Sequence, residues 1–233
     1  MTAPPASPLL SVIVMAYNEA ESLERVVREI DGVLERAAPR SEIVIVDDGS
    51  TDGTDTTADR LTSAMSRVRV VHHRPNQGLG GVYRSGFQEA RGDYVTFFPA
   101  DGQFPAGIIE LFLPRMRDHD MVLGYLPDRR GSVVSKALSF GERALYTVLF
   151  GRMPRFQGVL MFRRAILERV ELKSTGRGWA VLMELILRAS RERYRLTSVP
   201  TTLRPRMSGT SKVNNVRTIW SNTRQMVALR RYF

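Results

Sequence analysis

Short apolar segments alternate with longer segments of helical periodicity through the first half of the chain. Apolar runs of this length, rich in β-branched and aromatic residues, predict β-strands. The five strands expected on this basis are Leu10–Ala16, Glu42–Asp47, Val68–His72, Tyr94–Phe98 and Asp120–Gly124. Because strands separated by helices usually pair in parallel, the alternation predicts an α/β fold with a mostly parallel sheet covered by helices.

Helical periodicity is clearest directly after the first expected strand. Apolar residues recur there at intervals of three and four and form one face, made of Leu23, Val26, Val27, Ile30, Val33, Leu34 and Ala37. Beyond Gly124 the pattern is looser, and we expect a helix over 133–151, a strand over Gly158–Phe162, a helix over Trp179–Arg191, a strand over Arg195–Thr202 and a final helix over Asn214–Phe233. The apolar face of the final helix would contain Val216, Ile219, Trp220, Thr223 and Val227.

The composition is that of one globular domain. With 233 residues, 43% of them hydrophobic, the chain can bury one substantial core. It has no cysteine, so it offers neither disulfides nor thiolate metal ligands, which fits a reducing compartment. No apolar run reaches the ~20 residues needed to span a bilayer. We therefore expect a soluble or peripheral protein, with a disordered, proline-rich segment over residues 1–8.

The charge balance points to an anionic partner. The formal net charge is +10, and lysine occurs only at Lys136, Lys173 and Lys212, so nearly all of the 34 basic residues are arginines. Arginine suits bidentate phosphate contacts. No aromatic platform or recognition helix accompanies the basic residues, so we expect no nucleic-acid partner. A phosphate-bearing substrate or an anionic membrane surface fits better, and a basic surface that is simply solvated is the alternative.

Polar side chains follow three of the expected strands. Tyr17-Asn18-Glu19 follows the first, Asp47 through Thr54 the second, and Asp101 with Gln103 the fourth. Open α/β sheets bind ligands at the carboxyl ends of their strands, so this pattern suits a nucleotide with its divalent cation. One carboxylate of the Asp47-Asp48 pair could accept from a base N–H and from ribose hydroxyls. The alternative for Asp48 through Asp52 is an ordinary turn with a helix N-cap.

Glycines and histidines between the third and fourth strands carry weaker signals. The run from Asn76 to Gly81 resembles a phosphate loop that opens a helix at about residues 79–90. The adjacent His72 and His73 diverge on a strand, so we interpret them as structural residues.

Taken together, the motifs resemble a known family. Tyr17-Asn18-Glu19, Asp47 through Thr54, Asn76 through Gly81, and Gly92-Asp93-Tyr94 leading to Asp101-Gly102-Gln103 are similar in order and spacing to inverting glycosyltransferases of family two, which have the GT-A fold. The similarity continues through Gly158–Arg163, Ile166-Leu167, Glu184-Leu185, Arg188-Ala189, Val199-Pro200, Arg204, Arg206 and Ser208 through Lys212. This second set resembles the subgroup that includes dolichyl-phosphate mannosyltransferases and polyprenyl-phosphate glucosyltransferases.

The resemblance implies a fold, a reaction and roles for single residues. It implies a Rossmann-like GT-A sheet flanked by helices, and transfer of a hexose from a GDP- or UDP-linked sugar to polyprenyl or dolichyl phosphate with inversion. Donor contacts would come from Tyr17, Glu19, Asp48 and Gly78, and Mg²⁺ or Mn²⁺ would be held by Asp101 and Gln103. The acceptor phosphate would be bound by Arg204, Arg206, Ser208 and Lys212, and catalysis would depend on Asp101, Arg206 and Lys212.

The same resemblance gives the expected domain limits and location. Residues 9–212 would form a single GT-A domain, and residues 213–233 an amphipathic C-terminal helix. We expect a cytoplasmic protein, with a peripheral position at the cytoplasmic membrane face, or a membrane-protein partner, as further options. Oligomeric state, base and hexose are not identified by the sequence.

Two departures from the family pattern keep other functions open. Pro99 replaces the first aspartate of the usual Asp-x-Asp, which could weaken metal affinity, shift the metal preference or signal a changed donor. Arg155-Phe156-Gln157 lacks the subgroup's acidic residue, and Leu160 stands where arginine is common. One alternative is transfer to a hydroxyl of a soluble acceptor, with Glu184 as general base unless it only pairs with Arg188 or faces solvent. The other is a non-catalytic subunit that binds a nucleotide sugar.

Overall fold

The computed structural model describes residues 9–127, 147–151, 154–205 and 216–233. Within these ranges one sheet has the strand order β3-β2-β1-β4-β6-β5-β7. Its strands are β1 Leu10–Ala16, β2 Ser41–Asp47, β3 Val68–His72, β4 Tyr94–Pro99, β5 Met121–Tyr125, β6 Leu160–Arg163 and β7 Leu196–Pro200. All neighbouring pairs are parallel except those of β6, which is antiparallel to β4 and β5. The predicted mostly parallel α/β sheet is confirmed.

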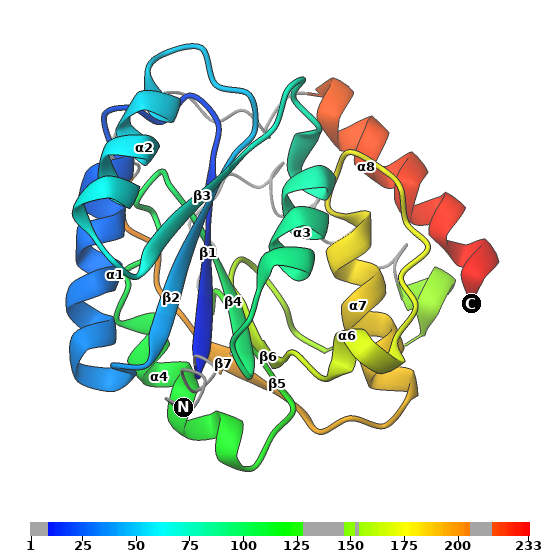
Figure 1. The fold of residues 1–233 in the computed structure, drawn as a ribbon. Helices are drawn as coiled ribbons and strands as arrows, with labels where there is room; N and C mark the ends of the chain where they lie inside the picture. Colours follow the sequence, from blue (N-terminus) through cyan, green and yellow to red (C-terminus); the bar gives the residue numbers. More distant parts are fainter. Residues whose placement is uncertain (1–8, 128–146, 152–153, 206–215) are drawn as a thin grey trace, which may run out of the picture.

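Helices cover both faces of the sheet (Figure 1). On one side lie α1 Leu23–Ala37, α2 Thr54–Ala64 and α4 Ile108–Phe112, the last continued by the 3₁₀ turn η1 Leu113–Arg117. On the other lie α3 Gly78–Glu89, α6 Ile166–Arg169, α7 Ala180–Arg191 and α8 Val216–Leu229, the last followed by η2 Arg230–Tyr232. Strand β7 ends at Pro200, two residues before the predicted limit.

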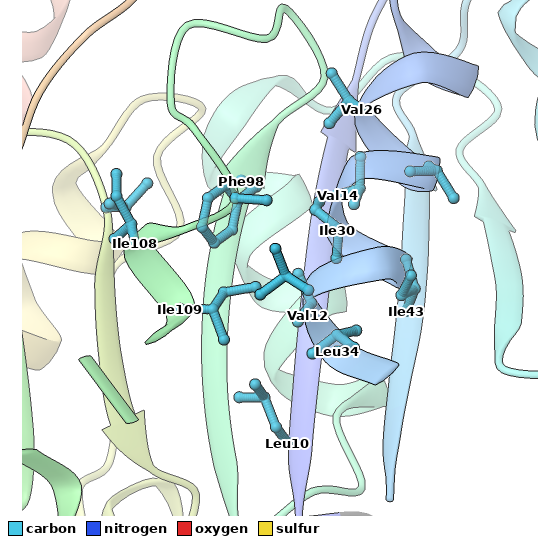
Figure 2. Close-up of a cluster of buried hydrophobic side chains, with 14 of the residues drawn as sticks. Leu10, Val12, Val14, Val26, Ile30, Leu34, Ile43, Phe98, Ile108 and Ile109 are labelled. Carbon is cyan, nitrogen blue, oxygen red and sulfur yellow. The ribbon is translucent and has the colours of Figure 1, made fainter. Parts of the chain in front are cut away.

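The core is divided by the sheet into two layers. On one side α1 and α4 bury their apolar residues against β1, β2 and β4, and Figure 2 shows Val12, Ile30 and Phe98 in this layer. On the other side α3 and α7 pack against residues of the opposite strand parity, including Ile13 and Val44. Six of the seven residues predicted on the apolar face of α1 are buried, and Ala37 is half-buried. Each fully buried aliphatic side chain contributes roughly 1.5–3 kcal/mol of transfer free energy, so the two layers stabilise the sheet that carries the strand ends.

The C-terminal helix α8 packs in part against α7. Met226 and Leu229 are buried against α7 and Phe150, whereas Val227 is 49% exposed. Val227, which the sequence places on the apolar face of this helix, is therefore largely open to solvent. This part of the helix thus completes the core.

The helix predicted over 133–151 lies mostly outside the described residues. Its last turn, Thr147–Phe150, is helical, with Phe150 buried and Val148 83% exposed. Among the helices that the structure describes, none has the length and apolar content to cross a membrane.

Candidate functional site

The sheet register brings the predicted polar motifs to a single edge. Ala16 at the end of β1 pairs with Asp47 at the end of β2, which in turn pairs with His72 at the end of β3. On the other side of β1, Met15 pairs with Pro99 at the end of β4. Because these strands are parallel, the loops that follow them all begin at the same side of the molecule, where such sheets bind ligands.

Hydrogen bonds tie the loop after β1 to the loop after β2. The Asn18 amide donates to Ser50 Oγ at 2.9 Å, and Asn18 Oδ1 accepts from the Thr51 amide at 2.9 Å. The Glu19 amide donates to Thr54 Oγ1 at 2.8 Å. Asn18 adopts a positive φ of 52°, a conformation that asparagine tolerates better than most residues. The two loops therefore form one preorganised wall.

Two predicted donor ligands lie on this wall with very different exposure. Tyr17 is 40% exposed. Glu19 is 9% exposed, and its Oε2 accepts from Ser22 Oγ at 3.2 Å. Tyr17 is thus accessible enough to stack on a ligand. Glu19, by contrast, already accepts a hydrogen bond within the protein.

Asp48 is held by three donors within the protein. It is 3% exposed, and its Oδ1 lies 2.7 Å from His73 Nδ1 and 2.8 Å from the Gln77 amide. Its Oδ2 accepts from the Gly78 amide at 2.9 Å. These contacts were not foreseen from the sequence, although His73 was interpreted as structural, and they fix the orientation of the carboxylate. A ligand that uses Asp48 would share an already oriented group.

Asp52 performs the turn function considered as the alternative for this motif. Its Oδ1 accepts from the Thr54 amide at 3.1 Å and the Thr54 hydroxyl at 2.5 Å, and its Oδ2 accepts from the Ala20 amide at 3.2 Å. Asp52 therefore closes the turn before α2 and links it to the β1 loop.

The glycines at the start of α3 have a packing reason. The Gly80 amide donates to Arg177 O at 2.8 Å, and a Cβ at Gly80 would collide with Gly176 O. At Gly78, φ is +75° and a Cβ would lie 2.7 Å from Arg177 O. The backbone N–H groups of Gln77, Gly78 and Gly80 thus donate hydrogen bonds to acceptors within the protein. In a phosphate-binding loop these N–H groups would instead be open to the phosphate. The helix start at Gly78 is close to the prediction, but packing of residues 176–178 explains the glycines.

Asp101 and Gln103 form a tight turn at the end of β4. Asp101 is 5% exposed, and its Oδ1 accepts from the Gln103 amide at 3.0 Å across Gly102, whose φ is +71°. Pro99 is the last residue of β4, where its missing N–H is tolerated. The residue set fits a hard cation shared with a substrate, because Mg²⁺ is commonly bound by one or two carboxylates plus phosphates and water. A cage of three or more His, Cys, Asp or Glu residues is absent from the described part of the chain.

The predicted acceptor-side residues are only partly described. The Arg204 amide donates to Gln103 O at 2.8 Å, which places the chain before residue 206 beside the Asp101 turn. The Arg204 guanidinium contacts both oxygens of Glu29 at 3.0 and 2.9 Å, so an acceptor phosphate would compete with this carboxylate. Arg206, Ser208 and Lys212 lie outside the described residues.

Glu184 is a buried structural carboxylate. It is fully buried on α7 and accepts from the amides of Lys173 and Ser174 at 2.7–3.0 Å. Its ion pair with Arg188, at 2.8 Å, confirms the pairing considered from the sequence. A carboxylate with these partners and no exposure is unsuited to abstract a proton from an acceptor.

The pair formed by Asp47 and His72 makes stability depend on pH. Burial raises the pKa of Asp47, but hydrogen bonds from Ser50 and His72 outweigh it, so this pKa lies below its ordinary value. Burial lowers the pKa of His72, whereas hydrogen bonds to Asp47 and Asp59 raise it, so this pKa lies above its ordinary value. The His72 contribution is present below about pH 6.5 and is lost as pH rises through the raised pKa. The Asp47 contribution is lost only as pH falls through the lowered pKa.

We expect His72→Gln to lose the alkaline part of this pH dependence. The free energy of unfolding of the parent should decline by less than about 1 kcal/mol above neutral pH, because His72 is partly exposed. Urea unfolding at several pH values measures the slope. His119→Gln, at a half-buried histidine whose ring Nδ1 lies 3.0 Å from Arg115 O, is the control and should keep the parental slope. Equal slopes in His72→Gln and the parent would contradict this account.

The strand-end site and the sheet define a class of protein, the GT-A glycosyltransferases. Residues 11–170 match Glycosyl transferase family 2, and the chain belongs to this family. The resemblance seen in the sequence motifs is thereby confirmed.

Curated relatives extend the similarity beyond the family match. The chain is 30% identical, over 96% of its length, to a dolichol-phosphate mannosyltransferase of Pyrococcus furiosus, of which it spans 64%. It is 33% identical, over 87% of its length, to a polyprenol monophosphomannose synthase of Mycolicibacterium smegmatis, of which it spans 80%. The longer first relative means that the chain corresponds to a part of that protein.

A solved structure supports the fold. Glucosyl-3-phosphoglycerate synthase from Mycobacterium tuberculosis, crystallised with Mn²⁺, UDP and glucosyl-3-phosphoglycerate, aligns with a TM-score of 0.68 at 19% identity, covering 95% of this chain and 78% of that one. At this identity the comparison establishes the GT-A fold.

Proposed function

We propose that this chain transfers a hexose from a GDP- or UDP-linked sugar to polyprenyl phosphate, with inversion at the anomeric carbon. The observation that carries the proposal is the turn at Asp101 and Gln103, joined through Gln103 O to the chain that enters the predicted acceptor segment. Donor-side and acceptor-side residues thus start from adjacent backbone. The curated relatives, named for dolichol phosphate and polyprenol, support the acceptor class.

The donor would bind along the wall formed by the loops after β1 and β2. The exposed part of Tyr17 offers a face for the base, and Glu19 and Asp48 offer carboxylates for base N–H groups or ribose hydroxyls. Gly78, whose amide is hydrogen-bonded to Asp48, has no side chain and a positive φ, so a ligand could approach the backbone closely at the start of α3. Because these contacts are remote from the reacting carbon, they would act mainly on donor affinity.

Asp101 and Gln103 would hold a divalent cation together with the diphosphate of the donor. When bound, Mg²⁺ or Mn²⁺ neutralises charge on the leaving nucleoside diphosphate. Asp101 contributes the negative charge that keeps the cation at the strand end, and Gln103 contributes a neutral oxygen. With Pro99 in place of a second carboxylate, the protein supplies fewer charges, and the donor phosphates supply the rest.

The acceptor phosphate would be oriented by the basic residues after β7. Arg206, Ser208 and Lys212, with Arg204 after release from Glu29, would place a phosphate oxygen beside the anomeric carbon. A lipid phosphate is already anionic near neutral pH, so orientation and charge placement replace proton abstraction. Burial of Glu184 fits this reaction better than transfer to a hydroxyl, which needs a base.

A polyprenyl acceptor requires access to a membrane surface. The end of α8 and η2 presents exposed arginines at 224, 230 and 231, and the exposed Val148 and Val227 lie on segments whose other residues pack together. Basic and apolar side chains of this kind favour anionic interfaces. We propose peripheral contact at the cytoplasmic membrane face through this region.

Transfer assays with defined acceptors test the proposal. Parent protein with Mg²⁺ or Mn²⁺ should transfer sugar from one member of a panel of GDP- and UDP-hexoses to polyprenyl phosphate. Arg206→Ala should reduce this transfer by about a hundredfold or more with little effect on donor affinity, and Arg206→Lys should recover part, since it keeps charge but loses the planar fork. Preferential transfer to a dephosphorylated prenol or to a sugar would contradict the proposed acceptor. Donor binding without transfer to any acceptor would favour a binding subunit.

A further inference from the structure

We propose that Arg177 is a positioning residue for the nucleotide donor, acting through Asn76 on the loop that orients Asp48. The inference rests on the proposed function, because it assigns to this arginine the alignment of a donor-binding wall. Arg177 comes from the segment before α7, about a hundred positions away in the sequence, and none of the motifs in that wall includes it.

Arg177 donates two hydrogen bonds to Asn76. Its Nη2 donates to Asn76 Oδ1 at 2.6 Å and its Nη1 donates to Asn76 O at 3.0 Å. The arginine is exposed, so burial of its side chain does not explain the contact. Two bonds from one planar fork fix both the side chain and the backbone of a single partner.

Asn76 passes this constraint on to the predicted donor carboxylate. Its Nδ2 donates to Asp48 O at 2.7 Å, and its Oδ1 accepts from the Gly78 amide at 3.1 Å. The Gly78 amide in turn reaches Asp48 Oδ2 at 2.9 Å. Asn76 thus contacts Asp48 directly through the backbone and indirectly through Gly78, so a shift of Asn76 would rotate the carboxylate away from its present direction.

The segment that carries Arg177 is itself held from two sides. Towards α3, the Gly80 amide donates to Arg177 O at 2.8 Å, and the absence of a side chain at Gly80 permits close contact with Gly176. Towards α8, Gln225 Oε1 accepts from the Gly178 amide at 3.0 Å. Arg177 therefore projects from a fixed support, which is what positioning of a second loop requires.

The experiment separates positioning from direct phosphate contact by using donor fragments. UDP and GDP are titrated by calorimetry, and uridine and guanosine by NMR, into the parent, Arg177→Ala, Arg177→Lys, Asn76→Ala and the double alanine variant. We expect Arg177→Ala to weaken the preferred diphosphate and its nucleoside equally, by about tenfold, as for loss of two hydrogen bonds. Asn76→Ala should act similarly and the double variant should be no worse than the single ones.

Kinetics and stability complete the test. At saturating donor, kcat of Arg177→Ala should stay near the parental value while the donor KM rises, and Arg177→Lys should recover part of the affinity. The thermal midpoint should move by no more than about 2 °C, because the arginine is exposed. Arg169→Ala, at an exposed arginine on α6, is the control and should bind as the parent does.

The outcomes distinguish this inference from the proposed function. Parent protein that binds neither diphosphate would overturn the proposed function, and the inference with it. Parental affinity in Arg177→Ala would overturn the inference alone. So would a loss confined to the diphosphates, which indicates that Arg177 touches phosphate directly, or an additive double variant, which shows that it does not act through Asn76.

Discussion

Asp101→Asn should reduce sugar transfer by roughly a hundredfold or more while the protein stays folded. The residue lies at a strand end, and its Oδ1 accepts from the Gln103 amide, a bond that the amide oxygen of asparagine can also accept. The substitution therefore removes charge from the predicted cation site with little change in packing, and loss of several kcal/mol of charge stabilisation corresponds to this fall in rate. Single-turnover transfer at saturating donor and Mn²⁺ measures the rate, and thermal unfolding measures whether the protein stays folded.

Asp52→Asn is the matched control at the same edge of the sheet. Asp52 closes the turn before α2 and should affect stability more than turnover. Gln103→Ala should have a smaller effect than Asp101→Asn, since water can replace a neutral ligand. Transfer by Asp101→Asn at the parental rate would remove Asp101 from the predicted cation site.

Glu184→Ala should lower the free energy of unfolding by roughly 3–5 kcal/mol, the effect of breaking a buried ion pair. The substitution leaves the guanidinium of Arg188 without this carboxylate and leaves the amides of Lys173 and Ser174 without their acceptor. The loop before α7 should also become more mobile, since Glu184 accepts the hydrogen bonds of two of its backbone amides. Chemical unfolding curves measure the change.

Glu168→Ala is the control for this prediction. Glu168 forms an i,i+4 pair with Arg164 as Glu184 does with Arg188, but its side chain is 62% exposed. An exposed pair contributes less than about 1 kcal/mol, so the two variants should differ severalfold in their effect. Similar small losses in both would show that Glu184 is not a structural anchor and would reopen its role as a base.

The secondary structure and the order of the strand ends could be predicted from local sequence patterns. The strand β1 and the helix α1 follow from local apolar periodicity, and their limits differ little or not at all from the prediction. The position of Asp101, two residues after the end of β4, also follows, because a parallel sheet aligns the ends of its strands whatever the loops do. Both the fold class and the edge that carries the candidate site depend on such short-range patterns.

Contacts between segments far apart in the sequence could not be predicted from local patterns. His73 lies 25 positions from Asp48, and Arg177 lies 101 positions from Asn76, yet both pairs hydrogen-bond. No periodicity specifies which surface lies opposite a glycine, so the glycine run predicts a phosphate loop where the structure packs Gly80 against Gly176. Local patterns record the preferences of one segment for helix, strand or turn, and these preferences determined the elements and the site's edge. The partners of Asp48, Glu184 and Gly80 were decided only when separate elements packed, because side-chain direction and close backbone approach depend on the whole core.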